Sequence, residues 1–156
     1  MHTDMSRYLF RGKRLMDNRW VVGYFMMSEP TQFTKRTRPV IVDMDSGIAE
    51  YVKTIGQSTG LKDSRDKLIF EGDIIRYRYR DYFSPEEPDG TENDWTISAV
   101  SWHGERSYPA FDISSHDDHF EANGLSTLLL SDDVFFEVIG NIHDSPELLE
   151  NGGKDE

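Results

Sequence analysis

Three arginines recur at alternate positions in the segment from Ile74 to Tyr82, and they are Arg76, Arg78 and Arg80. In an extended strand every second side chain points to the same face, so these guanidinium groups would project together, about 7 Å apart. That spacing is close to the distance between successive phosphates on one nucleic-acid strand. The stripe is therefore a candidate contact for nucleic acid or for a protein partner.

Tyr77 and Tyr79 alternate with the arginines and point the other way, so we expect them to anchor the strand to the core. A single-strand-binding surface needs aromatic rings on the same face as its cations, and this arrangement lacks them. A second interpretation pairs the arginines with carboxylates of the acidic second half of the chain, in the 84–94 loop or in a neighbouring subunit. The sequence leaves both interpretations open.

A second group of cations lies upstream in the polar segment of residues 31–38, and it consists of Lys35, Arg36 and Arg38. We expect a loop here, with Phe33 tucked in. A basic patch formed by this group and the arginine stripe would favour nucleic-acid binding.

One histidine pair has the spacing of a metal site, His116 and His119, with carboxylates nearby at Asp112, Asp117 and Asp118. Imidazole and carboxylate groups bind divalent metals. The spacing places both imidazoles on one face only if the segment is helical. A polar surface loop explains the same residues, and we assign no metal site.

No other segment has a recognisable catalytic pattern. The glycines of residues 56–60 lack the Gly-Lys-Ser/Thr that completes a phosphate-binding loop. No serine lies in a nucleophile-elbow context. Cysteine is absent, which excludes disulfides and a thiolate nucleophile. We predict no catalytic residue and no cofactor, and we do not expect an enzyme.

Charge is divided unevenly along the chain. Residues 1–80 hold 15 Lys/Arg and 10 Asp/Glu, a net charge of +5, whereas residues 81–156 hold 2 and 19, a net charge of −17. An acidic total argues against bulk DNA affinity, which needs clustered cations. The acidic half is either solvated surface or a surface that docks on a basic partner.

No apolar run approaches the ~18 residues of a membrane span, so we expect a soluble, cytoplasmic protein.

Short alternating runs bounded by turn residues predict a β-rich chain. The predicted strands include residues 8–12, 19–27, 39–43, 95–102 and 134–142. The first two form an N-terminal β-hairpin that turns at Asp17 and Asn18. A capping serine followed by proline, Ser145-Pro146, predicts a short C-terminal helix.

The fold class that follows is all-β to β-dominated α+β. We expect residues 60–142 to form a small SH3-like barrel, with the N-terminal hairpin packed on it. The predicted division is a β-hairpin region at 1–57, a barrel-like region at 58–149 and a disordered tail at 150–156. One continuous domain over residues 6–149 is the alternative.

The stretch from Thr54 to Arg80 organises the chain. We predict a loop and a tight turn, followed by the arginine-bearing strand. Gly60 and Gly72 can take positive φ, and Asp63 and Asp73 can accept backbone N–H bonds, so both blocks are explained by turn chemistry.

The strand at 134–142 is placed centrally in its sheet. Its Glu137 lies among apolar neighbours, so we expect an open face or a pairing of this carboxylate with an arginine. The large aromatic residues are predicted to be core rather than ligand platforms, and they are Trp20, Trp95, Trp102, Phe135 and Phe136.

Four blocks follow one another along the chain: residues 20–24 (Trp-Val-Val-Gly-Tyr), 55–63 (Ile-Gly-Gln-Ser-Thr-Gly-Leu-Lys-Asp), 69–75 (Ile-Phe-Glu-Gly-Asp-Ile-Ile) and 138–149, with Val-Ile-Gly-Asn-Ile and Pro-Glu-Leu-Leu. In this order the blocks resemble the YopX family of phage and prophage proteins. The resemblance spans about residues 7–149. It implies a phage-derived origin, a bacterial cytosolic location and a β-rich fold, and it implies no catalytic residues.

Three function classes follow from these observations. The first choice is a non-enzymatic protein-interaction or assembly module that forms a homo-oligomer or binds a host or phage protein. The alternative is a nucleic-acid-binding accessory protein that uses Arg76, Arg78, Arg80, Lys35, Arg36 and Arg38. A metal-dependent enzyme is the third class.

Overall fold

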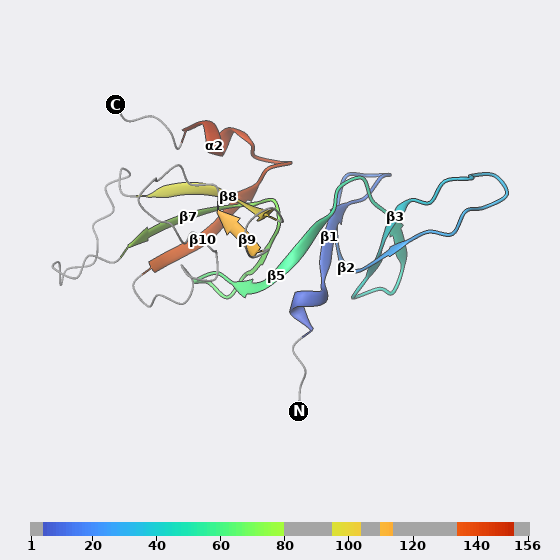
Figure 1. The fold of residues 1–156 in the computed structure, drawn as a ribbon, viewed down its shortest axis with the longest axis horizontal. Helices are drawn as coiled ribbons and strands as arrows, with labels where there is room; N and C mark the ends of the chain where they lie inside the picture. Colours follow the sequence, from blue (N-terminus) through green and yellow to red (C-terminus); the bar gives the residue numbers. More distant parts are fainter. Residues whose placement is uncertain (1–4, 80–94, 104–109, 114–133, 152–156) are drawn as a thin grey trace. The chain divides into compact units, whose positions relative to one another are not determined.

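The computed structural model describes residues 5–79, 95–103, 110–113 and 134–151, and the chain forms two compact units, Met1–Gly60 and Leu61–Glu156 (Figure 1). The predicted loop at residues 84–94, the His116–His119 segment and most of the predicted C-terminal tail lie outside the described residues. Each unit is described by itself below.

The first unit consists of short antiparallel strands in the order β4-β3-β2-β1-β5. Its elements are η1 (Ser6–Tyr8), β1 (Phe10–Lys13), β2 (Trp20–Met27), β3 (Pro39–Asp43), β4 (Ala49–Tyr51) and β5 (Gly56–Lys62), the last of which continues into the second unit. β1 and β2 are the predicted N-terminal hairpin, and Asn18 in their connection has a φ of 61°. That prediction is confirmed.

The core of the first unit lies on one face of its sheet. Strand alternation places Phe10, Val21 and Ile41 on this face, and Val52 packs against them. An isolated bridge between Arg14 and Val52 brings the chain after β4 back to the chain after β1. The sheet therefore encloses its small core on this side.

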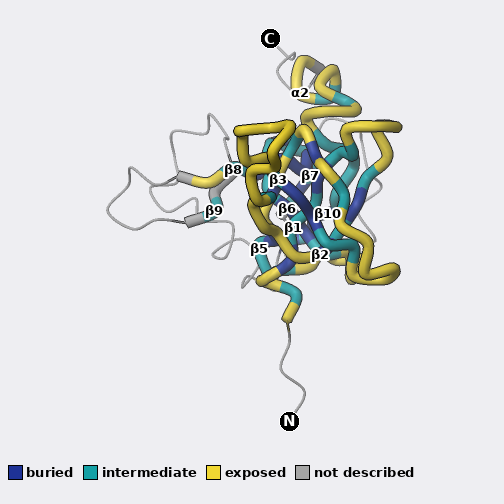
Figure 2. Tube along the Cα trace, turned by 90° about the vertical axis from the view of Figure 1, so that its right-hand side faces the viewer, coloured by how far each residue is buried: buried dark blue, intermediate teal, exposed yellow. Residues whose placement is uncertain are grey.

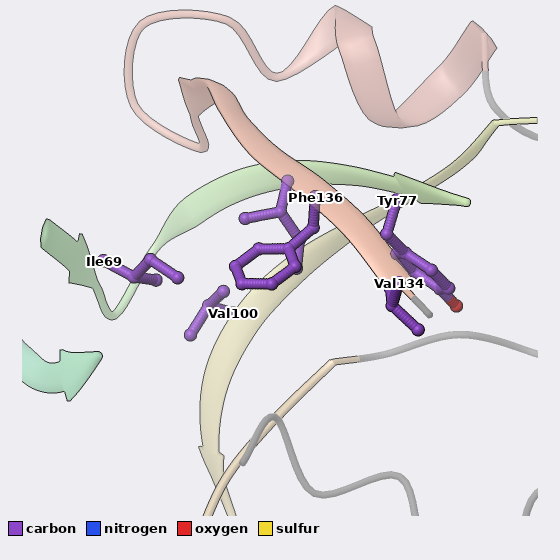
Figure 3. Packing of buried hydrophobic residues seen from close by; sticks show 6 residues of the cluster. Ile69, Tyr77, Val100, Val134 and Phe136 are labelled. Carbon is purple, nitrogen blue, oxygen red and sulfur yellow. The ribbon is translucent and has the colours of Figure 1, made fainter. Parts of the chain in front are cut away.

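The second unit contains β6 (Leu68–Phe70), β7 (Asp73–Tyr79), β8 (Thr96–His103), β9 (Ala110–Ile113), β10 (Val134–Asn141) and the short helix α2 (Glu147–Asn151). Four of these strands form an antiparallel sheet in the order β10-β7-β8-β9. Figure 2 shows buried segments along its strands, and Figure 3 shows the side chains that pack between them. The members of this core are Ile69, Ile75, Tyr77, Val100, Val134 and Phe136.

The predicted positive φ of Gly60 and Gly72 and the predicted acceptor role of Asp63 and Asp73 are confirmed. Gly60 has a φ of 75° and Gly72 a φ of 82°, values that favour glycine. The Asp73 carboxylate accepts the Phe70 N–H at 2.8 Å, and Asp63 accepts several backbone N–H groups. Both blocks therefore have a structural role.

Two element predictions are wrong. Residues 56–62, expected to be a loop and a turn, form strand β5 and pair with β1, because cross-strand pairing overrides the low strand propensity of glycine. The strand at 134–142 is not central, since β10 is the first strand of its sheet order. Its outer edge is instead covered by Ser64, whose N–H donates to the Phe136 carbonyl at 3.0 Å.

The fold is strand-dominated with two antiparallel sheets and one short helix, which confirms the predicted class and the C-terminal helix. The described strands do not close into a barrel. The predicted boundary between residues 57 and 58 lies inside β5.

Candidate functional site

The arginine stripe is positioned by strand β7. Its antiparallel register with β10 places Arg76 opposite Glu137 and Arg78 opposite Phe135, on the same face of the sheet. Tyr77 points to the other face and is 6% exposed. The prediction that Tyr77 anchors the strand to the core is confirmed. Arg80 and the Tyr79 side chain lie outside the described positions.

Glu137 is buried on this face and is neutralised by two arginines. Arg76 donates to its Oε1, and the Arg65 Nε lies 2.8 Å from its Oε2. The Glu137 side chain is only 6% exposed, whereas Arg65 is largely exposed. A buried carboxylate without such partners would be strongly destabilising. The predicted pairing of Glu137 with an arginine is confirmed, and it gives Arg76 a structural role.

Trp95 binds both described arginines of the stripe. The Cζ atoms of Arg76 and Arg78 each lie 4.5 Å from the centroid of the Trp95 ring. Phe135 packs against the same indole, with the ring centroids 5.9 Å apart and nearly perpendicular. Stacking of this kind fixes guanidinium groups in place by cation–π attraction. No pattern in the sequence pairs Trp95 with the arginines, because residues 80–94 separate the two segments.

The second predicted cation group lies in the first unit. Lys35, Arg36 and Arg38 are exposed in the connection between β2 and β3, and Ser28 closes this connection through its N–H to the Arg38 carbonyl at 2.8 Å. Phe33 is 87% exposed, so the prediction that it is tucked in is wrong. The structure assigns Lys35, Arg36 and Arg38 to the first unit and Arg76 and Arg78 to the second.

The β2 arm is a further feature, formed by the outer half of β2 and the connection that follows it. Its exposed side chains are Tyr24, Phe25, Met26, Met27 and Phe33. The four on the strand are between 38% and 47% exposed. Large apolar residues on both faces of this strand are therefore partly open to solvent, although Phe25 contacts Phe10 with the ring centroids 5.4 Å apart. Their alternation-free run, Tyr-Phe-Met-Met, was the signal available in the sequence.

The prediction for the large aromatic residues is correct for Phe136 and wrong for Trp102. Phe136 is buried in the core of the second unit, whereas Trp102 is 48% exposed and contacts Phe111 with its edge. Trp20 and Trp95 are half-buried and are covered by cations. In both cases the indole ring therefore stacks against a cationic side chain instead of packing in a core.

Metal ligation and membrane insertion find no support in the part of the chain that the structure describes. Those residues contain no cluster of three or more His, Asp or Glu side chains able to hold a metal ion. The His116 and His119 pair, with Asp117 and Asp118, lies beyond them, and the side chain of Asp112 is not described. No described helix has the length and apolarity needed to cross a membrane.

The described residues define a β-dominated protein of two units, with arginine and lysine side chains stacked on aromatic rings. The family model described as YopX protein matches residues 10–150, and the chain belongs to the YopX family. A crystal structure of protein EF1440 from Enterococcus faecalis is similar, at 23% sequence identity over 90% of this chain and 96% of that chain, with a TM-score of 0.44. No curated protein matches the chain.

Proposed function

We propose that this protein is a non-enzymatic protein-interaction or assembly module and that its β2 arm is the contact surface. The observation that carries the proposal is the run of exposed large side chains on the arm, Tyr24, Phe25, Met26, Met27 and Phe33. Large apolar side chains that are exposed close together on a small protein cost free energy in water, and they often mark interaction sites.

The composition of the arm also supports a protein contact. Aromatic residues, methionine and arginine are enriched at the centres of protein interfaces. Methionine adapts to irregular partner surfaces because its unbranched side chain has three rotatable bonds. The arm combines two methionines and three aromatic residues with nearby cations at Lys35, Arg36 and Arg38.

The proposal includes a phage or prophage origin and a place in the bacterial cytosol, as the family resemblance implies. The partner is either a second copy of the chain, which would give a homo-oligomer, or a host or phage protein. An SH3-like arrangement of the second unit would suit such a role, and it stays a prediction.

Nucleic-acid binding is the second candidate, and the stacking of Arg76 and Arg78 on Trp95 is the observation in its favour. The stack fixes the guanidinium planes in place while their edges can still donate to phosphate. It is the weaker candidate, because Arg76 already neutralises the buried Glu137.

Photo-cross-linking tests the proposed function. A benzophenone amino acid replaces Phe33, and the same group replaces Met16 in a control, since Met16 is 91% exposed in the β1–β2 connection, away from the arm. We expect irradiation in bacterial cells to give discrete protein adducts from position 33 and none from position 16. Identical patterns from the two positions, or no adduct from position 33, would refute the proposal.

A further inference from the structure

The outward face of the first unit places aromatic, aliphatic and basic side chains together. The strand register puts Tyr24 beside Val42 and Met26 beside Val40, with Tyr51 next to Val40 on the other side. These residues share the face opposite the core of Val21 and Ile41. We call this surface the outer face, and its members are Arg11, Lys13, Trp20, Val22, Tyr24, Met26, Arg38, Val42 and Tyr51. Val40 lies on the same side of the sheet but is buried.

The cations of the outer face lie over its aromatic rings. The Arg11 Cζ is 4.8 Å and the Lys13 Nζ is 5.5 Å from the Trp20 ring centroid. On the far strand, the Arg38 Cζ is 6.0 Å from the Tyr51 ring centroid. These positions hold positive charge at both margins of the face, with the apolar side chains between them.

The carboxylates of the same strands point the other way. Asp43 pairs with Gly23 and Glu50 with Ile41, so both belong to the opposite face, where Glu50 lies 2.9 Å from the Arg14 guanidinium. Strands β1 to β4 therefore contribute cations and apolar groups to the outer face and contribute their carboxylates to the other.

We infer that the outer face binds an acidic, amphipathic segment of a protein partner. The inference rests on the proposed interaction function and adds the chemistry of the partner. Apolar anchors of that segment would pack on Tyr24, Met26 and Tyr51, which are each close to half exposed. Its carboxylates would lie near Arg38 and the neighbouring Lys35 and Arg36, where rim charges steer association and set specificity.

The same geometry disfavours single-stranded nucleic acid on this face. Bases bind such surfaces by stacking on open aromatic rings. Here cations already lie over the Trp20 and Tyr51 rings, and the centre of the face is aliphatic at Val42 and Met26. Carboxylates and apolar side chains match this arrangement better than stacked bases do.

A displayed library of random peptides tests the inference with the full-length protein as bait. We expect the selected peptides to be enriched in both acidic and apolar residues. A labelled selected peptide should lose about tenfold in affinity with Met26→Ser or Arg38→Glu. Met16→Ser is the control, since Met16 is exposed in the β1–β2 connection, outside both the β2 arm and the outer face, and it should change the affinity less than about twofold.

Four outcomes would overturn the inference. They are selection of basic or uncharged peptides, equal effects of Met26→Ser and Met16→Ser, failure to select any peptide, and displacement of the peptide by a single-stranded oligonucleotide that binds the same residues. If Arg38→Glu lowers the melting temperature, the affinity is measured with Lys35→Glu instead. Lys35 is exposed in the connection between β2 and β3, so its replacement should not disturb the fold. Cross-linking at Phe33 without acidic peptide preference would leave the proposed function in place and refute only this inference.

Discussion

Asp63 is a buried carboxylate that connects a turn to a distant strand. Its Oδ1 accepts the N–H groups of Arg65 and Lys67, each at 2.9 Å, and its Oδ2 accepts the Val138 N–H at 3.0 Å. Because Val138 lies 75 residues further along the chain, this side chain attaches the turn after β5 to the outer edge of β10. Such charge-assisted bonds are stronger than bonds between neutral groups.

Asp63→Ala should therefore destabilise the protein by about 3 kcal/mol, since it leaves buried backbone donors without an acceptor. Chemical denaturation of the purified variant measures this change. Asp66→Asn is the control: Asp66 is exposed in the same turn, and asparagine tolerates its φ of 66°. Comparable losses in the two variants would contradict the role assigned to Asp63.

Arg76 and Arg78 share a stack on Trp95 but differ in their charge partners. Arg76 also bonds to the buried Glu137, so Arg76→Ala should cost about 2 kcal/mol of unfolding free energy. Arg78→Ala removes the ring contact without touching Glu137 and should cost less than about 1 kcal/mol. Paired urea titrations measure the difference. A larger loss of stability in Arg78→Ala than in Arg76→Ala would show that the Arg76–Glu137 ion pair is not the main stabilising contact of the two arginines.

At the scale of elements, the sequence predicted strands where periodicity and turn chemistry agreed. Residues 39–43 form β3 as expected, because an apolar run lies between a proline and an Asp-Ser-Gly turn. The hairpin of β1 and β2 followed from the same signals at Asp17 and Asn18. The pairing of Glu137 with an arginine could also be anticipated, since a carboxylate in an apolar strand needs a partner.

Other elements depend on contacts that no local pattern contains. β5 is a strand because β1 pairs with it, although its residues 56–60 have the composition of a loop. β10 lies at the start of its sheet order although it contains a run of large apolar residues, since Ser64 and Asp63 cover its outer edge. The cation–aromatic contacts of Trp20 and Trp95 likewise depend on strand register and on neighbouring segments.

The turn between β3 and β4 gives a prediction for acid pH. Backbone N–H groups of Ser46 and Asp45 donate to the Asp43 carboxylate, and these bonds hold its pKa below the ordinary value for aspartate. A carboxyl group with a lowered pKa in the folded state stabilises the fold above its unfolded pKa of about 3.9, and this contribution is lost as the pH falls through the folded pKa.

Asp43→Asn keeps an oxygen acceptor but does not titrate in this range. Its melting temperature should therefore fall less steeply than that of the wild-type protein below about pH 4. Melting curves across this range measure the slopes, and Asp45→Asn serves as a control in the same turn. Parallel curves for Asp43→Asn and wild type would show that the Asp43 carboxylate contributes nothing to acid stability.

At the scale of the whole molecule, the chain builds two cores with no residue in common. Ile41 is completely buried in the core of the first unit, and Ile69 is completely buried in that of the second. Each core includes side chains from strands far apart in the sequence, so each stabilises its own set of cross-strand pairs. Local stability can differ between such units, and amide hydrogen exchange detects the difference.

Ile41→Ala and Ile69→Ala should each create a cavity and cost about 2–5 kcal/mol. We expect Ile41→Ala to accelerate amide exchange mainly in β2 and β3, and Ile69→Ala to accelerate it mainly in β7 and β10. Exchange measured by mass spectrometry on proteolytic fragments resolves these strands. Met16→Ser, at an exposed position, should leave both patterns unchanged. Uniform acceleration over all four strands by either core variant would mean that the two units unfold as a single cooperative body.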